Sequence, residues 1–183
     1  MLNPRELVDV MTFYKPIHIL AEEGKPLMVS LLSLLLVFVF YGVVFVGLSA
    51  LMSGAFSSEM LQSPEMKTLE KAFAFLILQV PIATTAAFIL SRIFTRKGSL
   101  AGIISVNYFL CACAALFALV TIIPYAQFAG LLLFLLSGIL YLYFLEESFE
   151  KLFEISSLKS VGLTIVYAII TLSLWGLSAQ FPL

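Results

Sequence analysis

The sequence predicts an all-α fold, a polytopic membrane bundle of five transmembrane helices with short amphipathic helices at the membrane surface. Of its 183 residues, 62% are apolar and 11% are charged, well below the roughly 25% of charged residues in a soluble domain. A soluble fold of this size cannot bury so much apolar surface, so the composition indicates an integral membrane protein. The apolar segments lack the alternation of barrel strands, which favours helices.

Long runs without charge define the spans. A helix needs about 20 residues to cross about 30 Å of hydrocarbon, and the run between Lys97 and Glu146 contains 48 uncharged residues. This run must fold back, and Pro124 is the expected corner because proline interrupts a helix. We expect a cytoplasmic amphipathic tail at 1–26 and a five-span membrane domain at 27–183. The expected spans are about 27–52, 72–92, 100–122, 127–145 and 160–179.

The basic residues are distributed unevenly between the two sides of this arrangement. Eight of the ten Lys and Arg residues lie in the tail, in the loop between spans two and three, or in the loop between spans four and five. The positive-inside rule therefore places the amino terminus in the cytoplasm and the carboxyl terminus outside or in a lumen. Arg92, Arg96 and Lys97 form a basic cluster that can contact anionic lipid headgroups, although the positive-inside bias alone also explains it.

Two segments outside the spans have amphipathic patterns. The tail has apolar residues at helical spacing, and we expect two short helices there on the membrane surface. The segment Glu146–Ile155 is expected to be a further helix at the cytoplasmic interface, with Phe149, Leu152 and Phe153 facing lipid or the bundle. Either segment fits an in-plane anchor or a docking face for a cytoplasmic protein partner.

A few polar residues lie within the expected spans. Counting 1.5 Å per residue, Asn107 in span three lies level with Thr84 and Thr85 in span two, while Gln79 lies nearer the outer edge. The short loop between these spans makes them antiparallel neighbours. Because an unpaired amide in hydrocarbon is costly, we expect Asn107 to hydrogen-bond near Thr84 or Thr85. This cluster is either a structural feature or a solute-binding group.

Groups for catalysis or metal binding are scarce. The lone histidine, His18, and the lone aspartate, Asp9, both lie in the tail, so the spans lack a Ser–His pair or an aspartyl pair. Cys111 and Cys113 point about 200° apart on a helix, which disfavours a disulfide between them. The net charge of −1 gives no signal for nucleic acid. We expect no catalytic residues, no metal and no cofactor.

The order of features resembles the Yip/Yif family, five-span proteins named for interaction with Ypt/Rab GTPases. The resemblance rests on six short segments: Asn3-Pro4-Arg5-Glu6-Leu7, Tyr14-Lys15-Pro16, Arg96-Lys97-Gly98-Ser99-Leu100, Ser105-Val106-Asn107-Tyr108, Leu140-Tyr141-Leu142-Tyr143 and Ile155-Ser156-Ser157-Leu158-Lys159. It implies a five-span fold with a cytoplasmic amino terminus. The short tail is similar to the prokaryotic branch, which implies a prokaryotic cell membrane.

Two functions remain open from the sequence. The first is a non-enzymatic membrane protein of Yip type that scaffolds or organises membrane-associated partners. The second is a small channel or transport component acting as an oligomer, with Gln79, Thr84, Thr85 and Asn107 along one face. The sequence leaves the oligomeric state undetermined.

Overall fold

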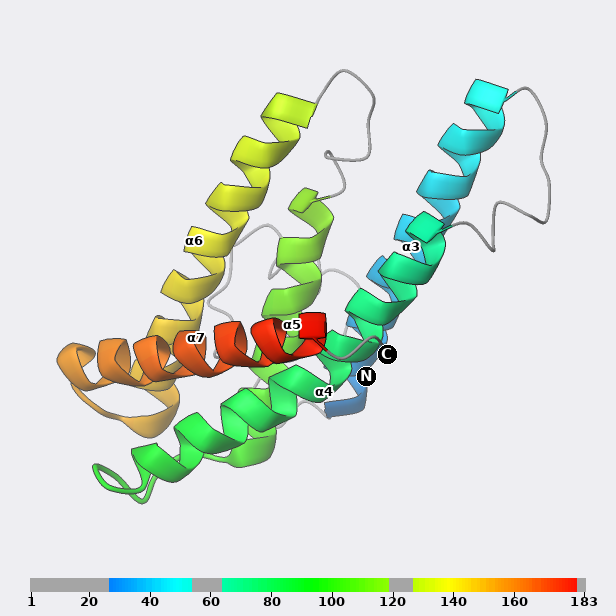
Figure 1. Ribbon diagram of the computed structural model, residues 1–183. Helices are drawn as coiled ribbons and strands as arrows, with labels where there is room; N and C mark the ends of the chain where they lie inside the picture. Colours follow the sequence, from blue (N-terminus) through cyan, green and yellow to red (C-terminus); the bar gives the residue numbers. More distant parts are fainter. Residues whose placement is uncertain (1–26, 54–63, 119–126, 181–183) are drawn as a thin grey trace.

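The chain forms a helical bundle, which confirms the predicted fold class. The computed structural model describes residues 27–53, 64–118 and 127–180, and every regular element in these ranges is a helix (Figure 1). The helices are α3 (Leu27–Ser53), α4 (Pro64–Ser91), α5 (Leu100–Ala118), α6 (Gln127–Phe153) and α7 (Ser157–Gln180). The predicted tail at 1–26, with its surface helices, lies outside the described residues, as does the expected corner at Pro124.

Four of these helices, α3, α4, α6 and α7, are long and apolar enough to cross a membrane. The sequence predicts five spans, which is one more than the four helices that meet this criterion. The remaining helix, α5, has 19 residues, or about 28 Å at 1.5 Å per residue. That length is close to the roughly 30 Å of a hydrocarbon core, and a crossing by α5 stays a prediction.

The fourth span differs most from its predicted bounds. We expected it to end near residue 145 and to be followed by a separate surface helix over Glu146–Ile155, but α6 continues unbroken to Phe153. The expected boundary near residue 145 is wrong, because the helix has no break there. The expected helical conformation of the segment is confirmed as far as Phe153, and Phe149 and Phe153 are fully buried in the bundle core, which is one of the two placements expected for them. The helix ends at Glu154, which adopts a left-handed backbone conformation with φ of 49°.

Helix α5 lies at the centre of the bundle and packs against α3, α4 and α6, while α7 packs against α4 and α6. Two short connections, 92–99 between α4 and α5 and 154–156 between α6 and α7, lie at one end, which we call the short-loop end. A bond of 2.6 Å between Ser30 Oγ and Ser105 Oγ places the start of α3 beside the start of α5, at this same end. The short-loop half has a dense core that includes Ile103, Phe149 and Phe153.

Helix α4 contains Pro81 and bends in its middle (Figure 1). Proline has no N–H, so the carbonyl of Ile77, one turn earlier, loses its helical partner. The hydroxyl of Tyr108 on α5 donates to this carbonyl at 2.7 Å. The neighbouring helix thereby satisfies the group that proline leaves unpaired, as a membrane environment requires.

Removing this hydroxyl with Tyr108→Phe should destabilise the protein by about 1–2 kcal/mol, because the buried Ile77 carbonyl would lose its donor. In a Pro81→Ala background the same change should cost much less, because the restored N–H at position 81 can donate to Ile77. Reversible unfolding of the four proteins in mixed micelles measures both costs. Equal costs in the two backgrounds would show that the Tyr108 hydroxyl does not replace the N–H that Pro81 lacks.

Candidate functional site

Asn107 on α5 is the centre of a polar network buried inside the bundle. Its side chain is fully buried, and its Nδ2 donates to Oγ1 of Thr84 on α4 at 2.8 Å. The expected hydrogen bond between these spans is therefore confirmed. Thr84 and Asn107 are each seven residues from the helix ends that the 92–99 connection joins, so the two side chains meet at the same depth.

The network extends to two helices that the sequence analysis did not connect to Asn107. Oδ1 of Asn107 accepts hydrogen bonds from the hydroxyls of Tyr141 on α6 and Tyr167 on α7, the latter at 3.3 Å. The two hydroxyl oxygens are themselves 2.7 Å apart, and Sγ of Cys111 lies 3.9 Å from both Tyr141 Oη and Asn107 Oδ1. One amide thus joins α4, α5, α6 and α7.

The other polar residues expected near Asn107 are placed differently. Thr85 is half-buried, and Thr84 rather than Thr85 receives the amide hydrogen bond. Gln79 is buried, and its Nε2 donates to Oγ1 of Thr171 on α7 at 2.8 Å. Because Gln79, Thr84 and Asn107 are all buried within one copy of the chain, they do not form an exposed polar face.

Sequence reasoning missed the tyrosines and Thr171. The signal that was available is the position of Tyr141 and Tyr167 deep within apolar runs, since a tyrosine hydroxyl in hydrocarbon needs a hydrogen-bond partner. Depth alone does not select the partner, because a helix can present any of its faces to a neighbour. The rotation of α6 and α7 about their axes decides which partner each tyrosine reaches.

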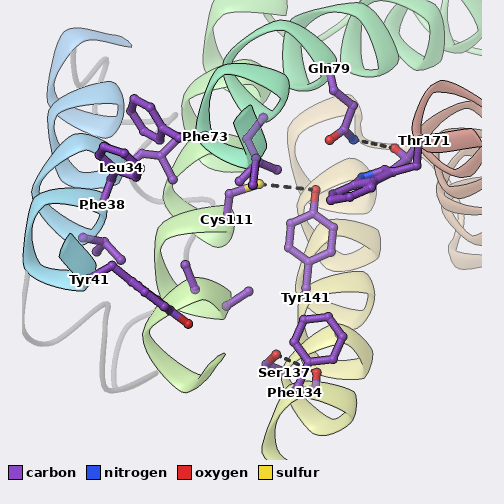
Figure 2. A pocket seen from close by; sticks show the side chains of 17 residues that line it. Leu34, Phe38, Tyr41, Phe73, Gln79, Cys111, Phe134, Ser137, Tyr141 and Thr171 are labelled. Atoms are coloured by element: carbon purple, nitrogen blue, oxygen red, sulfur yellow. Dashed lines mark hydrogen bonds between the residues drawn. The ribbon is translucent and has the colours of Figure 1, made fainter. Parts of the chain in front are cut away.

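A cavity of about 410 Å³ lies beside the network, toward the end opposite the short loops (Figure 2). All five described helices line it, and Cys111 and Tyr141 belong both to its wall and to the network. The other lining side chains are Leu34, Val37, Phe38, Tyr41, Ala72, Phe73, Leu76, Gln79, Ala114, Ala115, Phe134, Ser137, Thr171 and Trp175, with Gly138 completing the wall. The cavity therefore has mainly apolar walls and a few polar groups.

At the short-loop end, the residues expected to contact headgroups make contacts within the protein. The Arg92 guanidinium donates to the carbonyls of Lys97 at 3.3 Å and Gly98 at 3.1 Å, and it lies 4.1 Å above the centre of the Phe88 ring. Nζ of Lys97 pairs with the Glu154 carboxylate in the other connection. Both partners of this pair are exposed, so its contribution to stability is small. Arg96 is exposed, and headgroup binding by the three basic residues stays a prediction.

Packing joins the two connections more firmly than the ion pair does. Gly98 has a positive φ of 86°, and a Cβ built at this position would overlap the Phe153 ring at the end of α6. On the same side, Ser160 in the first turn of α7 donates to the Glu146 carboxylate of α6. A carboxylate at a helix amino terminus is also favoured by the helix dipole. The 92–99 connection is therefore in contact with the end of α6 and with Glu154 of the 154–156 connection.

The side chains of the polar network, the cavity wall and the short-loop end are suited to hydrogen bonding and packing. Within the described ranges, no three His, Cys, Asp or Glu side chains lie close enough to hold a metal ion. Comparisons of the chain with protein-family models, with curated proteins and with solved structures found no match.

Because Asn107 and Thr84 share a hydrogen bond, a double-mutant cycle of Asn107→Leu and Thr84→Val should give a coupling energy of about 0.6–1.7 kcal/mol. The matched cycle with Thr85→Val, one residue along α4, should give a coupling close to zero. Unfolding free energies in mixed micelles provide both values. A coupling at Thr85 as large as that at Thr84 would show that the amide is bound differently.

Gly98→Ala should lower the free energy of unfolding by about 2–4 kcal/mol, because the left-handed conformation and the overlap with Phe153 both add strain. Gly162→Ala is the control, since a Cβ at Gly162 meets nothing within 4 Å. Thermal unfolding of the two variants in detergent should show a midpoint lowered by several degrees for Gly98→Ala alone. Equal midpoints would mean that the two connections are not in close contact.

Proposed function

We propose that this chain is a non-enzymatic, multi-pass membrane protein of Yip type that organises partners at a cytoplasmic surface formed by its short-loop end. In this proposal the chain spans a prokaryotic cell membrane five times, with its amino terminus in the cytoplasm and its carboxyl terminus outside. The observation that carries the proposal is the joining of the two short connections into one surface by Gly98, Phe153 and the pair of Lys97 with Glu154.

A pre-ordered surface is well suited to binding, because a partner then loses less free energy in ordering the loops that it contacts. The short-loop end combines charged side chains, including the exposed Arg96 and Lys151, with the exposed apolar residues Ile93, Phe94 and Leu158. Apolar contacts flanked by charges are typical of protein interfaces with a polar rim. This composition supports a protein partner.

The attachment point of the tail lies at the same end of the bundle. Because Ser30 of α3 bonds to Ser105 of α5, α3 begins at the short-loop end, and residues 1–26 are attached there. The tail contributes Arg5, Lys15 and Lys25 to the basic residues of this side. The positive-inside rule supports placing this side in the cytoplasm.

The alternative, a small channel or transport component, has less support. An oligomeric pore would need polar side chains on an outer face of each copy, but Thr84 and Asn107 are fully buried inside one copy. Their hydrogen-bonding groups already pair with each other and with Tyr141 and Tyr167. We therefore favour the scaffold.

A biotin ligase fused to the amino terminus should label partners in native membranes only from the cytoplasm, where ATP is available. A double charge reversal at the short-loop end, Arg96→Glu with Lys151→Glu, should reduce recovery of a reproducible partner by about tenfold, which corresponds to about 1.4 kcal/mol. The control is the same reversal at the opposite end, Lys67→Glu with Lys71→Glu, at two exposed lysines of α4. Recovery there should equal that of the unmodified protein.

Two results would count against the scaffold. One is equal loss of the partner in both reversal variants, which would show that the partner does not bind specifically at the short-loop end. The other is the recovery of no reproducible partner together with solute flux in reconstituted liposomes, which would favour the channel.

A further inference from the structure

The cavity between the five helices has the properties of a ligand site. Its volume of about 410 Å³ lies within the roughly 300–1,000 Å³ that is usual for small-molecule pockets. Large apolar side chains such as Phe38, Phe73 and Phe134 form much of its wall. Lipid chains are as apolar as these side chains, so a ligand that comes from the bilayer is selected by packing and by its polar contacts.

One polar group in the wall has an unfilled hydrogen-bonding position. The Gln79 side chain is only 3% exposed, and its Nε2 is bonded to Thr171. Among the described residues, its Oε1 is buried without a partner, and Figure 2 shows this oxygen turned away from Thr171 and above Tyr141. Leaving a buried carbonyl oxygen unpaired costs about 1–3 kcal/mol. The oxygen is closed even to a water molecule, so the Gln79 side chain must turn toward the cavity before the donor of a ligand can reach it and remove this cost.

The charge of the ligand follows from the wall and from the depth. None of the lining side chains is Asp, Glu, Lys, Arg or His, so a buried charge would find no counter-ion and would be strongly disfavoured. Gln79 is twelve residues from the end of α4 at Ser91, or about 18 Å along the helix. In a hydrocarbon core about 30 Å thick this places Gln79 about 12 Å from the opposite edge, so a lipid would have to bring a charged headgroup below the interface to contact it.

We propose that the cavity binds a neutral amphiphile, a long-chain alcohol delivered from the bilayer, whose hydroxyl donates to Oε1 of Gln79. A hydroxyl suits this position in either orientation of the amide, because it can donate to Oε1 or accept from Nε2. A single water molecule is a weaker occupant, since a stable buried water needs two to four polar partners and the surrounding wall is mainly apolar.

The only tryptophan of the chain, Trp175, lies in the wall of the cavity but is 46% exposed. Probes in the lipid can therefore also quench it, and only the saturable part of the quenching reports occupancy. The protein in phosphatidylcholine nanodiscs is titrated with three probes of equal length: a terminally brominated undecanol, the corresponding bromoalkane and the corresponding bromo carboxylic acid. The alcohol should quench Trp175 with a saturable curve. The acid should give no saturable component at about pH 10, where it is ionised even though the bilayer raises the pKa of its carboxyl group. The bromoalkane should bind at least about fivefold more weakly than the alcohol, because it lacks the hydrogen bond.

Gln79→Leu removes the acceptor and keeps a side chain of similar size. It should weaken binding of the alcohol by about five- to tenfold and leave that of the bromoalkane unchanged. Gly138→Phe, in the wall, tests occupancy independently of Gln79 and should weaken binding of every probe. Its matched control, Gly162→Phe, lies outside the wall, and a Cβ at either glycine meets nothing within 4 Å. Thermal unfolding verifies that each variant is folded.

Two outcomes would overturn the proposal. Non-saturating quenching, equal for the three probes, would mean that Trp175 meets them only in the surrounding lipid. Saturable quenching that is equal for alcohol and bromoalkane and unchanged by Gln79→Leu would mean that the cavity takes acyl chains without recognising a hydroxyl.

Discussion

A polar side chain buried among apolar helices needs a hydrogen-bond partner, because neither hydrocarbon nor apolar side chains supply one. The arrangement of this bundle depends on how that requirement is met at Asn107. Its amide bonds to side chains from three other helices, Thr84, Tyr141 and Tyr167, and so places α4, α6 and α7 around α5. The same requirement explains the bond from Tyr108 to the carbonyl that Pro81 leaves unpaired. Polar pairing sets the positions of the helices, and apolar packing fills the space between them.

The two halves of the bundle differ in density because of their side chains. In the short-loop half, the aromatic side chains of Phe149 and Phe153 fill the space between α4, α5 and α6. In the opposite half, small residues such as Ala72, Ala114 and Gly138 stand among the lining positions. Small residues at facing positions leave volume unfilled, which accounts for the cavity. One end of the bundle thus has an ordered surface, and the other half has a site of apolar character.

Much of the fold could be predicted from sequence because hydropathy is a local property. The uncharged runs predicted the helices and their order, and the short connection after Ser91 predicted that Asn107 bonds near Thr84 or Thr85, of which the structure selects Thr84. The prediction failed at Glu146, where charged residues indicated that the span had ended. Charge marks where a helix leaves hydrocarbon, but it does not break the helix, and α6 continues to Phe153 with its aromatic face buried.

By itself, the sequence determined the all-helical class, the approximate helices and the position of each polar residue along its helix, since these follow from composition and from a rise of 1.5 Å per residue. Only the tertiary structure decided which way each helix faces. The rotation of α6 and α7 about their axes brings Tyr141 and Tyr167 to Asn107 and Thr171 to Gln79. The cavity also depends on the tertiary structure, because side chains from five helices together line it. No single segment carries that information, since rotation is set by the neighbours against which a helix packs.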